Sequence, residues 1–316
     1  MSQSGADDEV DFPFHAHCAF CRDRCTPPQP TDSSYVMVTN VWNERGDIER
    51  AFKRLSRQTK KPLIWLWIDD GSNDGTAEEI ERVSRLYPDL TVWIESMPPK
   101  SKGNINTIGR AYSRFMPGFI ERLKGRRVDY FTIQDVDNRP CPNYFARILY
   151  LMDHDMAVGA SSGTPVGEEG MRESGMPMGG CKVTRWKIIS RIQKYWDLSP
   201  DTYVNINALK MGYKLRIWRV PVLLDRPTTA ITSKGVFQQG RLNYYVGRPF
   251  LGVLVRAIWR AVLGRHGTEL LRGYMSERAK GNWRCTDPIV TEFYGRGRSQ
   301  VWVLVQMLKT RGKYSG

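Results

Sequence analysis

The sequence has 316 residues, 41% of them hydrophobic and 25% charged, an ordinary globular composition that allows a sizeable buried core. Its 47 Lys and Arg residues against 33 Asp and Glu give a formal net charge of +14, so we expect polyanionic partners: nucleic acid, an anionic membrane or phosphorylated substrates. No stretch reaches the roughly 20 uninterrupted apolar residues of a membrane-spanning helix, and the polar, acidic N-terminus lacks the pattern of a signal peptide. We therefore expect a cytoplasmic protein, with contact to a membrane surface left open.

The chain begins with a polar leader, residues 1–34, that ends in a proline-rich linker signal. Six cysteines do not make a disulfide framework at this length, and Cys141, Cys181 and Cys285 are expected to be plain buried thiols. The leader itself is dense in soft ligands. It is expected either to hold a structural Zn²⁺ or to be merely disordered or packed; the candidate zinc ligands are His15, His17, Cys18, Cys21 and Cys25.

Residues 35–225 alternate strand-like and helix-like segments. Apolar runs typical of buried strands occupy residues 35–41, 63–68, 90–94 and 130–133. Segments with one apolar helical face lie between them, over residues 47–58, 76–86 and 104–115. This alternation predicts an α/β fold with a mostly parallel sheet covered by helices. Ligands of such sheets bind beyond the carboxyl ends of the strands.

An acidic, glycine-containing loop, Asp69–Thr76, follows the second predicted strand. Its glycines allow a tight turn, and its carboxylates are suited to hydrogen bonds with a base or a ribose. The alternative is a solvated loop in which Asp74 or Thr76 begins the next helix as its N-cap.

A second acidic segment, Asp135-Val136-Asp137, follows the fourth predicted strand. Residues two apart on an extended chain point to the same side. Two carboxylates placed in this way form a hard-oxygen site for Mg²⁺ or Mn²⁺, completed by water and substrate phosphate. The alternative is a strand end capped by polar residues, but paired charges beside an apolar strand are costly without a counter-ion.

Asp201 is expected at the start of a helix, where the helix dipole favours an acid. It is therefore a candidate either for a helix cap or for a general base that takes the proton of an acceptor hydroxyl.

Residues 226–316 are basic, rich in aromatic residues and expected to be mainly helical. The run Pro249–Gly264 is apolar but contains Arg256 and Arg260, as a helix lying in an anionic membrane surface does. A second apolar run, Val301–Leu308, precedes a basic end. The alternative is that both helices pack on the catalytic domain with solvated arginines.

Six segments occur in the order and spacing of one enzyme family: Val38–Glu44, Asp69–Thr76, Lys102-Gly103, Asp135–Asp137, Asp201 with Gly212-Tyr213, and Gln238–Arg241. Through them, residues 36 to about 245 resemble glycosyltransferase family 2, the inverting enzymes of GT-A fold, and are similar to its lipid-linked or cellulose-synthase-like members. Pro200, Asn207 and Leu242 depart from the family pattern and leave the acceptor open.

The resemblance implies a role for each matched residue. It implies that Asp135 and Asp137 bind Mg²⁺ or Mn²⁺ and that Asp201 is the catalytic base. It also implies a UDP- or GDP-linked sugar donor, held by Thr39, Asn43, Glu44, Asp70, Asp74, Lys102, Gly103, Asp135, Gln238 and Arg241.

The sequence thus predicts a metal-dependent inverting glycosyltransferase with a lipid-linked or other hydroxyl or phosphate acceptor, peripheral on the inner face of a membrane. The alternatives are a glycosyltransferase acting on nucleic acid or protein, a basic nucleic-acid-binding protein without turnover, and a zinc-stabilised interaction module with an inactive transferase fold.

Overall fold

A computed structural model describes residues 31–99, 108–165, 176–195, 199–226, 232–282 and 284–295. The candidate zinc ligands, Lys102, Gly103 and the run Val301–Leu308 lie outside these residues. The three scattered cysteines are free and buried, as predicted.

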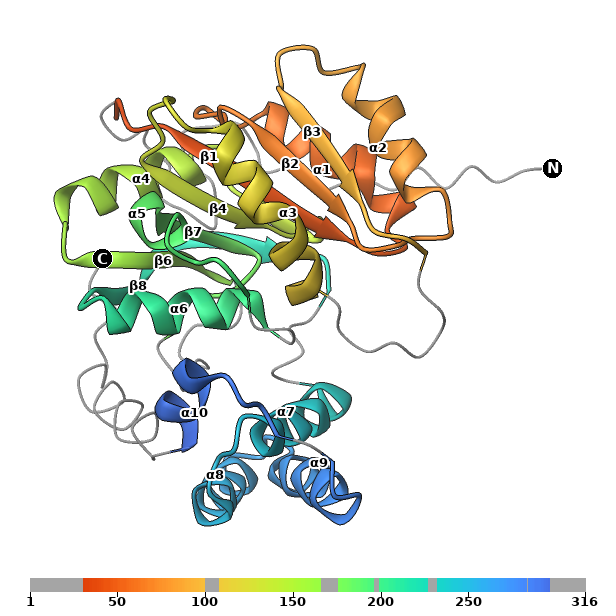
Figure 1. The fold of residues 1–316 in the computed structure, drawn as a ribbon, viewed down its shortest axis with the longest axis vertical. Coiled ribbons are helices and arrows are strands. Elements are labelled where there is room, and N and C mark those ends of the chain that lie inside the picture. Colours follow the sequence, from red (N-terminus) through yellow and green to blue (C-terminus); the bar gives the residue numbers. More distant parts are fainter. Residues whose placement is uncertain are drawn as a thin grey trace.

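One eight-stranded mixed sheet forms the centre of the molecule (Figure 1). Its strand order is β3-β2-β1-β4-β7-β6-β8-β5, and the first four of these neighbours run parallel. Only β7 and β5 run opposite to the other strands of this sheet, so the expected mostly parallel α/β sheet is confirmed. The strands are β1 Tyr35–Val41, β2 Trp65–Asp69, β3 Val92–Ser96, β4 Tyr130–Gln134, β5 Asn138–Pro140, β6 Val158–Pro165, β7 Cys181–Arg185 and β8 Lys214–Leu224.

Helices cover both faces of the sheet and form two apolar clusters. One cluster joins α1, α2 and α4 to the sheet, and the other joins α3, α5, α6 and α10. The helices are α1 Ile48–Ser56, α2 Thr76–Ser84, α3 Ile108–Arg122, α4 Tyr144–His154, α5 Trp186–Ile189, α6 Pro200–Lys210, α7 Ser233–Tyr245, α8 Phe250–Val262, α9 Gly267–Ala279 and α10 Pro288–Gly295. Because both faces are covered, β1, β2 and β4 are almost entirely buried.

Two predicted boundaries were wrong. The second strand begins at Trp65, not at Leu63, because Leu63 is 43% exposed at the edge of the core and the strand extends to include Asp69. The third helix continues to Arg122 through Pro117, because Phe119 still has an apolar cluster to pack against.

Helices α7, α8 and α9 form a separate bundle below the sheet in Figure 1, with a small apolar cluster of their own. Glycines let these helices approach very closely. A Cβ atom on Gly240 of α7 would collide with the Leu270 carbonyl of α9, and one on Gly273 of α9 would collide with the Phe237 carbonyl of α7. The bundle therefore holds a fixed internal geometry.

Helix α8 is oriented differently from the sequence-based expectation. Its outward face is apolar, with Leu251 70% exposed, Ile258 57% and Val262 75%. Arg260 is buried and its Nε donates to the Arg265 carbonyl, while Arg256 is half-buried. The expected placement of Arg260 at a membrane surface was wrong, because its side chain is buried on the inner side of the helix, whereas the expectation for the half-buried Arg256 stays a prediction. Among the described residues, no helix is long and apolar enough to cross a membrane.

Candidate active site

The carboxyl ends of β1 and β2 are joined by hydrogen bonds between the segments that follow them. Asn43, in a left-handed conformation with φ of 56°, accepts from the Asn73 backbone N–H at 3.0 Å and donates its own N–H to Ser72 Oγ at 2.8 Å. The Glu44 N–H donates to Thr76 Oγ1 at 3.0 Å. The first two predicted donor-binding segments therefore form one continuous rim.

Within this rim, Asp74 serves the start of α2. Its carboxylate accepts from the Thr76 N–H at 3.0 Å and from the Arg45 N–H at 3.3 Å. Slight burial raises the pKa of Asp74, but these hydrogen bonds outweigh it and hold the pKa below its usual value. The N-cap of α2 is Gly75, so the expectation that Asp74 or Thr76 is the N-cap was wrong, although Asp74 still binds the N–H of the first helical residue. Asp70 is almost fully buried, and its N–H donates to the Val41 carbonyl at the end of β1.

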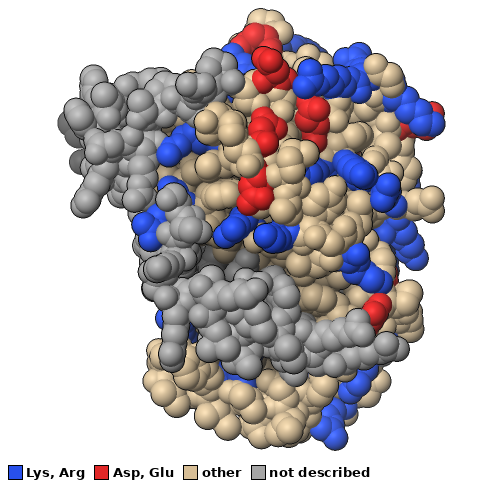
Figure 2. All heavy atoms as spheres, turned by 90° about the vertical axis from the view of Figure 1, so that its left-hand side faces the viewer, with Lys and Arg blue, Asp and Glu red and all other residues tan. Residues whose placement is uncertain are grey.

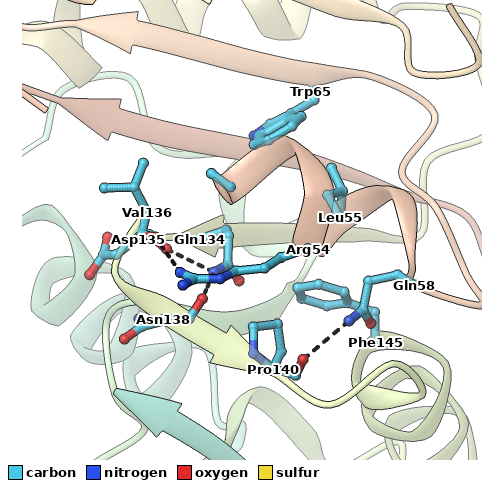
Figure 3. Close-up of a pocket in the computed structure, with 11 residues that line it drawn as sticks. Arg54, Leu55, Gln58, Trp65, Gln134, Asp135, Val136, Asn138, Pro140 and Phe145 are labelled. Carbon is cyan, nitrogen blue, oxygen red and sulfur yellow. Dashed lines mark hydrogen bonds between the residues drawn. The ribbon is translucent and has the colours of Figure 1, made fainter. Parts of the chain in front are cut away.

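The loop that carries Asp135 and Asp137 is fixed through its backbone (Figure 3). Gln134 Nε2 donates to the Asp135 carbonyl at 2.8 Å, and Arg54, reaching across from α1, donates to the Val136 carbonyl at 3.0 Å. The Asp225 N–H donates to the Asp137 carbonyl at 2.9 Å. Because hydrogen bonds hold these three backbone carbonyls, the loop fixes the positions of the Asp135 and Asp137 side chains.

Like charge and burial act together on this loop. They raise the pKa of Asp135 to about 7. Burial is the largest cause, and the negative charges of Asp137 and Asp201 raise the pKa further, while the positive charges of Lys182 and Arg226 lower it. The pKa of Asp137 is also raised, chiefly by burial, with Arg226 opposing. The Asp135 side chain nevertheless meets solvent, which screens part of the effect. A bound cation would relieve this repulsion.

Arg226, which directly follows β8, bridges two strand ends. Its Nε lies 3.2 Å from Asp137 Oδ2, and its Nη2 lies 2.9 Å from Glu44 Oε2 and 3.5 Å from Asp47 Oδ2. The side chain is 53% exposed. Arg226 thus forms ion pairs both with Asp137 after β4 and with the acidic residues of the segment after β1, at the surface of the site.

Two consecutive glycines separate Asp135 from Asp201. A Cβ atom on Gly180 would collide with the Asp135 carboxylate and with Asn138, and one on Gly179 would lie 3.0 Å from Asp201 Oδ2. Asp201 is the second residue of α6, as predicted, and its side chain is 31% exposed. The structure therefore brings Asp135, Asp137 and Asp201 to one place.

The carboxylates at this end of β4 are suited to bind a divalent cation. Asp135 and Asp137 offer hard oxygen atoms, which suit Mg²⁺ or Mn²⁺, and the missing side chain at Gly180 lets the backbone pass directly beside the Asp135 carboxylate. Within the part of the chain that the structure describes, no three His, Cys, Asp or Glu residues are placed so that they could hold one metal ion together. The two carboxylates would thus leave room for water and phosphate ligands.

Three predicted donor-binding residues make other contacts. Thr39 is fully buried and accepts from Trp65 Nε1 at 2.8 Å, so its hydroxyl belongs to the core and not to the rim. Arg241 pairs with Glu277 of α9 at 2.6 Å and donates to Gln238 at 3.1 Å, so both side chains serve the contact between α7 and α9.

Sequence reasoning missed four residues of the site: Gly179, Gly180, Lys182 and Arg226. Two signals were available, namely consecutive glycines directly before a strand and a lysine inside the short run Cys181–Val183. Arg226 gave no signal, because only the fold brings residue 226 to residues 44 and 137.

Comparison with known proteins supports the fold. No protein-family model matches the sequence, and no curated protein is significantly similar to it. A mannosyltransferase from Pyrobaculum calidifontis, solved with GDP-mannose and Mn²⁺, matches with a TM-score of 0.55 at 16% identity, over 91% of this chain and 90% of that one. A glucosyl-3-phosphoglycerate synthase from Mycobacterium tuberculosis, with Mn²⁺ and UDP-glucose, reaches a TM-score of 0.47 at 12% identity, over 67% of this chain and 78% of that one, which is too low to carry an argument. The chain has the GT-A fold.

We predict that Gly180→Ala abolishes cation binding while the protein stays folded. The new methyl group would collide with the Asp135 carboxylate and Asn138 and would displace one metal ligand. Calorimetric titration with Mn²⁺ in the presence of UDP or GDP measures the effect. Gly118→Ala is the matched control, since a Cβ atom there would meet nothing within 4 Å. Unchanged Mn²⁺ affinity in Gly180→Ala would contradict the placement of the cation.

We predict that Asp135 lowers the unfolding free energy of the metal-free protein as the pH rises from about 4 to about 7. Its pKa is about 7 in the folded chain and about 3.9 in an unfolded one. Between these values only the folded chain holds the proton, so stability is lost as the pH rises. Asp135→Asn, which stays uncharged, should gain stability relative to the wild type across this window and level off above it. Denaturant unfolding of both proteins tests this, and a pH-independent difference would refute it.

Proposed function

We propose that the chain is a glycosyltransferase that moves a sugar from a nucleoside diphosphate to an acceptor with the help of a divalent cation. The observation that carries the proposal is the meeting of Asp135, Asp137 and Asp201 around Gly179 and Gly180 at the carboxyl end of β4. The GT-A fold and the motif order that resembles family 2 support the same conclusion.

In this proposal the donor lies along the rim after β1 and β2, the position where such sheets bind ligands. Asn43, which is exposed on this rim, would contact its nucleoside, which we take to be linked through UDP or GDP. Asp135 and Asp137 would hold Mg²⁺ or Mn²⁺, which supplies positive charge for the diphosphate leaving group. Arg226, with its half-exposed guanidinium beside Asp137, would turn to the phosphate oxygens, for which its forked donors are suited.

Asp201 would act as the general base on the acceptor. As the acceptor oxygen bonds to the anomeric carbon, the bond from that carbon to the diphosphate oxygen breaks, and Asp201 takes the hydroxyl proton. A single displacement of this kind inverts the anomeric centre, and general-base catalysis typically contributes about 10²–10⁴-fold. The side chain of Asp201 is open enough for this role at 31% exposure.

We further infer that the acceptor is lipid-linked and that α8 rests on an anionic membrane. A row of exposed large apolar residues follows one face of α8: Leu251, Val255, Ile258, Trp259 and Val262. Contiguous apolar patches of this kind mark interaction sites. In the sequence, residues 226–316 contain 16 Lys or Arg and only 4 Asp or Glu, and a region of this net positive charge is suited to anionic lipid.

The lower end of the molecule in Figure 2, where the α7–α9 bundle lies, is mostly uncharged on this face, with Lys and Arg at its margins. An apolar surface with a basic margin is the arrangement of an interfacial helix. In this proposal the membrane contact is made by the exposed apolar face of α8 and not by the buried Arg260.

We predict that turnover depends on a divalent cation and on Asp137. UDP-glucose and GDP-mannose are offered as donors with Mn²⁺, and release of nucleoside diphosphate is measured. Asp137→Ala should remove both release and Mn²⁺-dependent nucleotide binding, because one of two metal ligands is lost. Asp89→Ala, at an exposed surface ion pair with Lys61, is the control and should behave as wild type. Full turnover in excess chelator would exclude the proposed role, and polyanion binding without turnover would favour a nucleic-acid-binding protein.

We predict that the protein floats with vesicles containing about one-third anionic lipid at low salt, and less so as salt screens the attraction. Ile258→Ser with Val262→Ser should weaken flotation at least about tenfold, because two exposed apolar side chains are lost from the contact. Leu86→Ser is the matched control, since Leu86 is 58% exposed on the sheet domain. Equal flotation of all three proteins would rule out α8 as the membrane contact. Charge reversal at Arg260 is unsuitable, because the residue is buried.

A further inference from the structure

Lys182 is a fully buried lysine on β7, next to the glycine pair of the site. An ammonium group withdrawn from water is costly unless other groups satisfy it. Its Nζ donates to the Asp201 carbonyl at 2.6 Å and lies 3.8 Å from Asp201 Oδ2. The side chain thus meets both the backbone and the carboxylate of the residue assigned as base.

The other oxygen of Asp201 is also held. Ser199 Oγ donates to Asp201 Oδ1 at 2.6 Å and contacts Thr202 Oγ1 at 2.9 Å. Oδ2 therefore lies between the Lys182 ammonium and the backbone at Gly179, where a side chain would crowd it. The carboxylate is fixed from the buried side and remains accessible from the side of the site.

Lys182 also connects the base to the strand of the metal ligands. It stands opposite Ile133 in the register of β7 with β4, and the Asp135 N–H donates to the Gly180 carbonyl at 2.8 Å. The Lys182 ammonium opposes the rise in the pKa of Asp135. One buried cation therefore faces two carboxylates that repel each other.

We infer that Lys182 is a positioning residue of the transfer reaction, whose ammonium fixes the Asp201 carboxylate relative to the Asp135 strand. The inference rests on the proposed function. It assigns the buried lysine to the chemical step, because its ammonium contacts both the backbone carbonyl and the carboxylate of Asp201.

The test is a double-mutant cycle with Lys182→Met, which keeps the length of the side chain but removes its charge and its donors. In otherwise wild-type protein, turnover at saturating donor should fall at least about tenfold, while the Mn²⁺-dependent Kd for UDP or GDP changes less than about threefold. In the Asp201→Asn background, Lys182→Met should reduce turnover by no more than about twofold further, because the group it positions is already lost.

Thr184→Val is the matched control. Thr184 lies two residues along β7, is fully buried, and its hydroxyl has no hydrogen-bond partner among the described residues. Wild-type turnover is expected for this variant. If Lys182→Met does not fold, Lys182→Gln, which retains a polar amide, takes its place in the cycle.

Full turnover of Lys182→Met, or losses that multiply in the double mutant, would overturn the inference. A wild-type protein without Mn²⁺-dependent nucleotide binding would instead contradict the proposed function. In that case, denaturant unfolding of the wild type, the two single mutants and the double mutant still decides whether Lys182 and Asp201 interact. Non-additive midpoints support the positioning of Asp201 by Lys182, and additive midpoints refute it.

Discussion

The main electrostatic feature of the site is repulsion between its carboxylates, which the surrounding structure has to offset. Asp135, Asp137 and Asp201 come together at the end of β4, although like charges in a poorly hydrated place disfavour ionisation. Two cations offset this repulsion, Lys182 from the buried side and Arg226 from the surface. Acids gathered in this way are unfavourable for stability alone, which is why we connect them with a function that needs positive charge.

The sheet makes this gathering possible. Parallel strands β1, β2 and β4 end at the same edge, so segments far apart in the sequence meet there. Arg54 then ties the loop after β4 to α1 and to Asp225, with 2.8 Å between Arg54 Nη2 and Asp225 Oδ2. The carboxylates are therefore carried by rigid backbone, and the space between them is made by the absence of side chains at Gly179 and Gly180.

Local patterns in the sequence were sufficient for the first four strands, the acidic strand ends and the helix start at Asp201, because each depends on neighbours in the chain. They did not predict β5 to β8, and they were insufficient where a role depends on a distant partner. Thr39 matches a family motif, yet its hydroxyl is committed to Trp65. Arg241 likewise pairs with Glu277. Arg260 of α8 was placed on the wrong side, because an amphipathic pattern with apolar residues on both faces does not say which face is buried.

The position of Arg226 has a consequence for ion selectivity. Its guanidinium is tethered beside Asp137, so its effective concentration there is high, in the millimolar range typical of short flexible tethers or above. A free monovalent ion brings the same charge without the tether and competes poorly for the carboxylate. In the proposed function a divalent ion, with twice the charge, would displace the guanidinium and free it for an incoming anion. Arg226 is thus a built-in counter-ion of Asp137, and its exchange for a metal would link metal binding to phosphate binding.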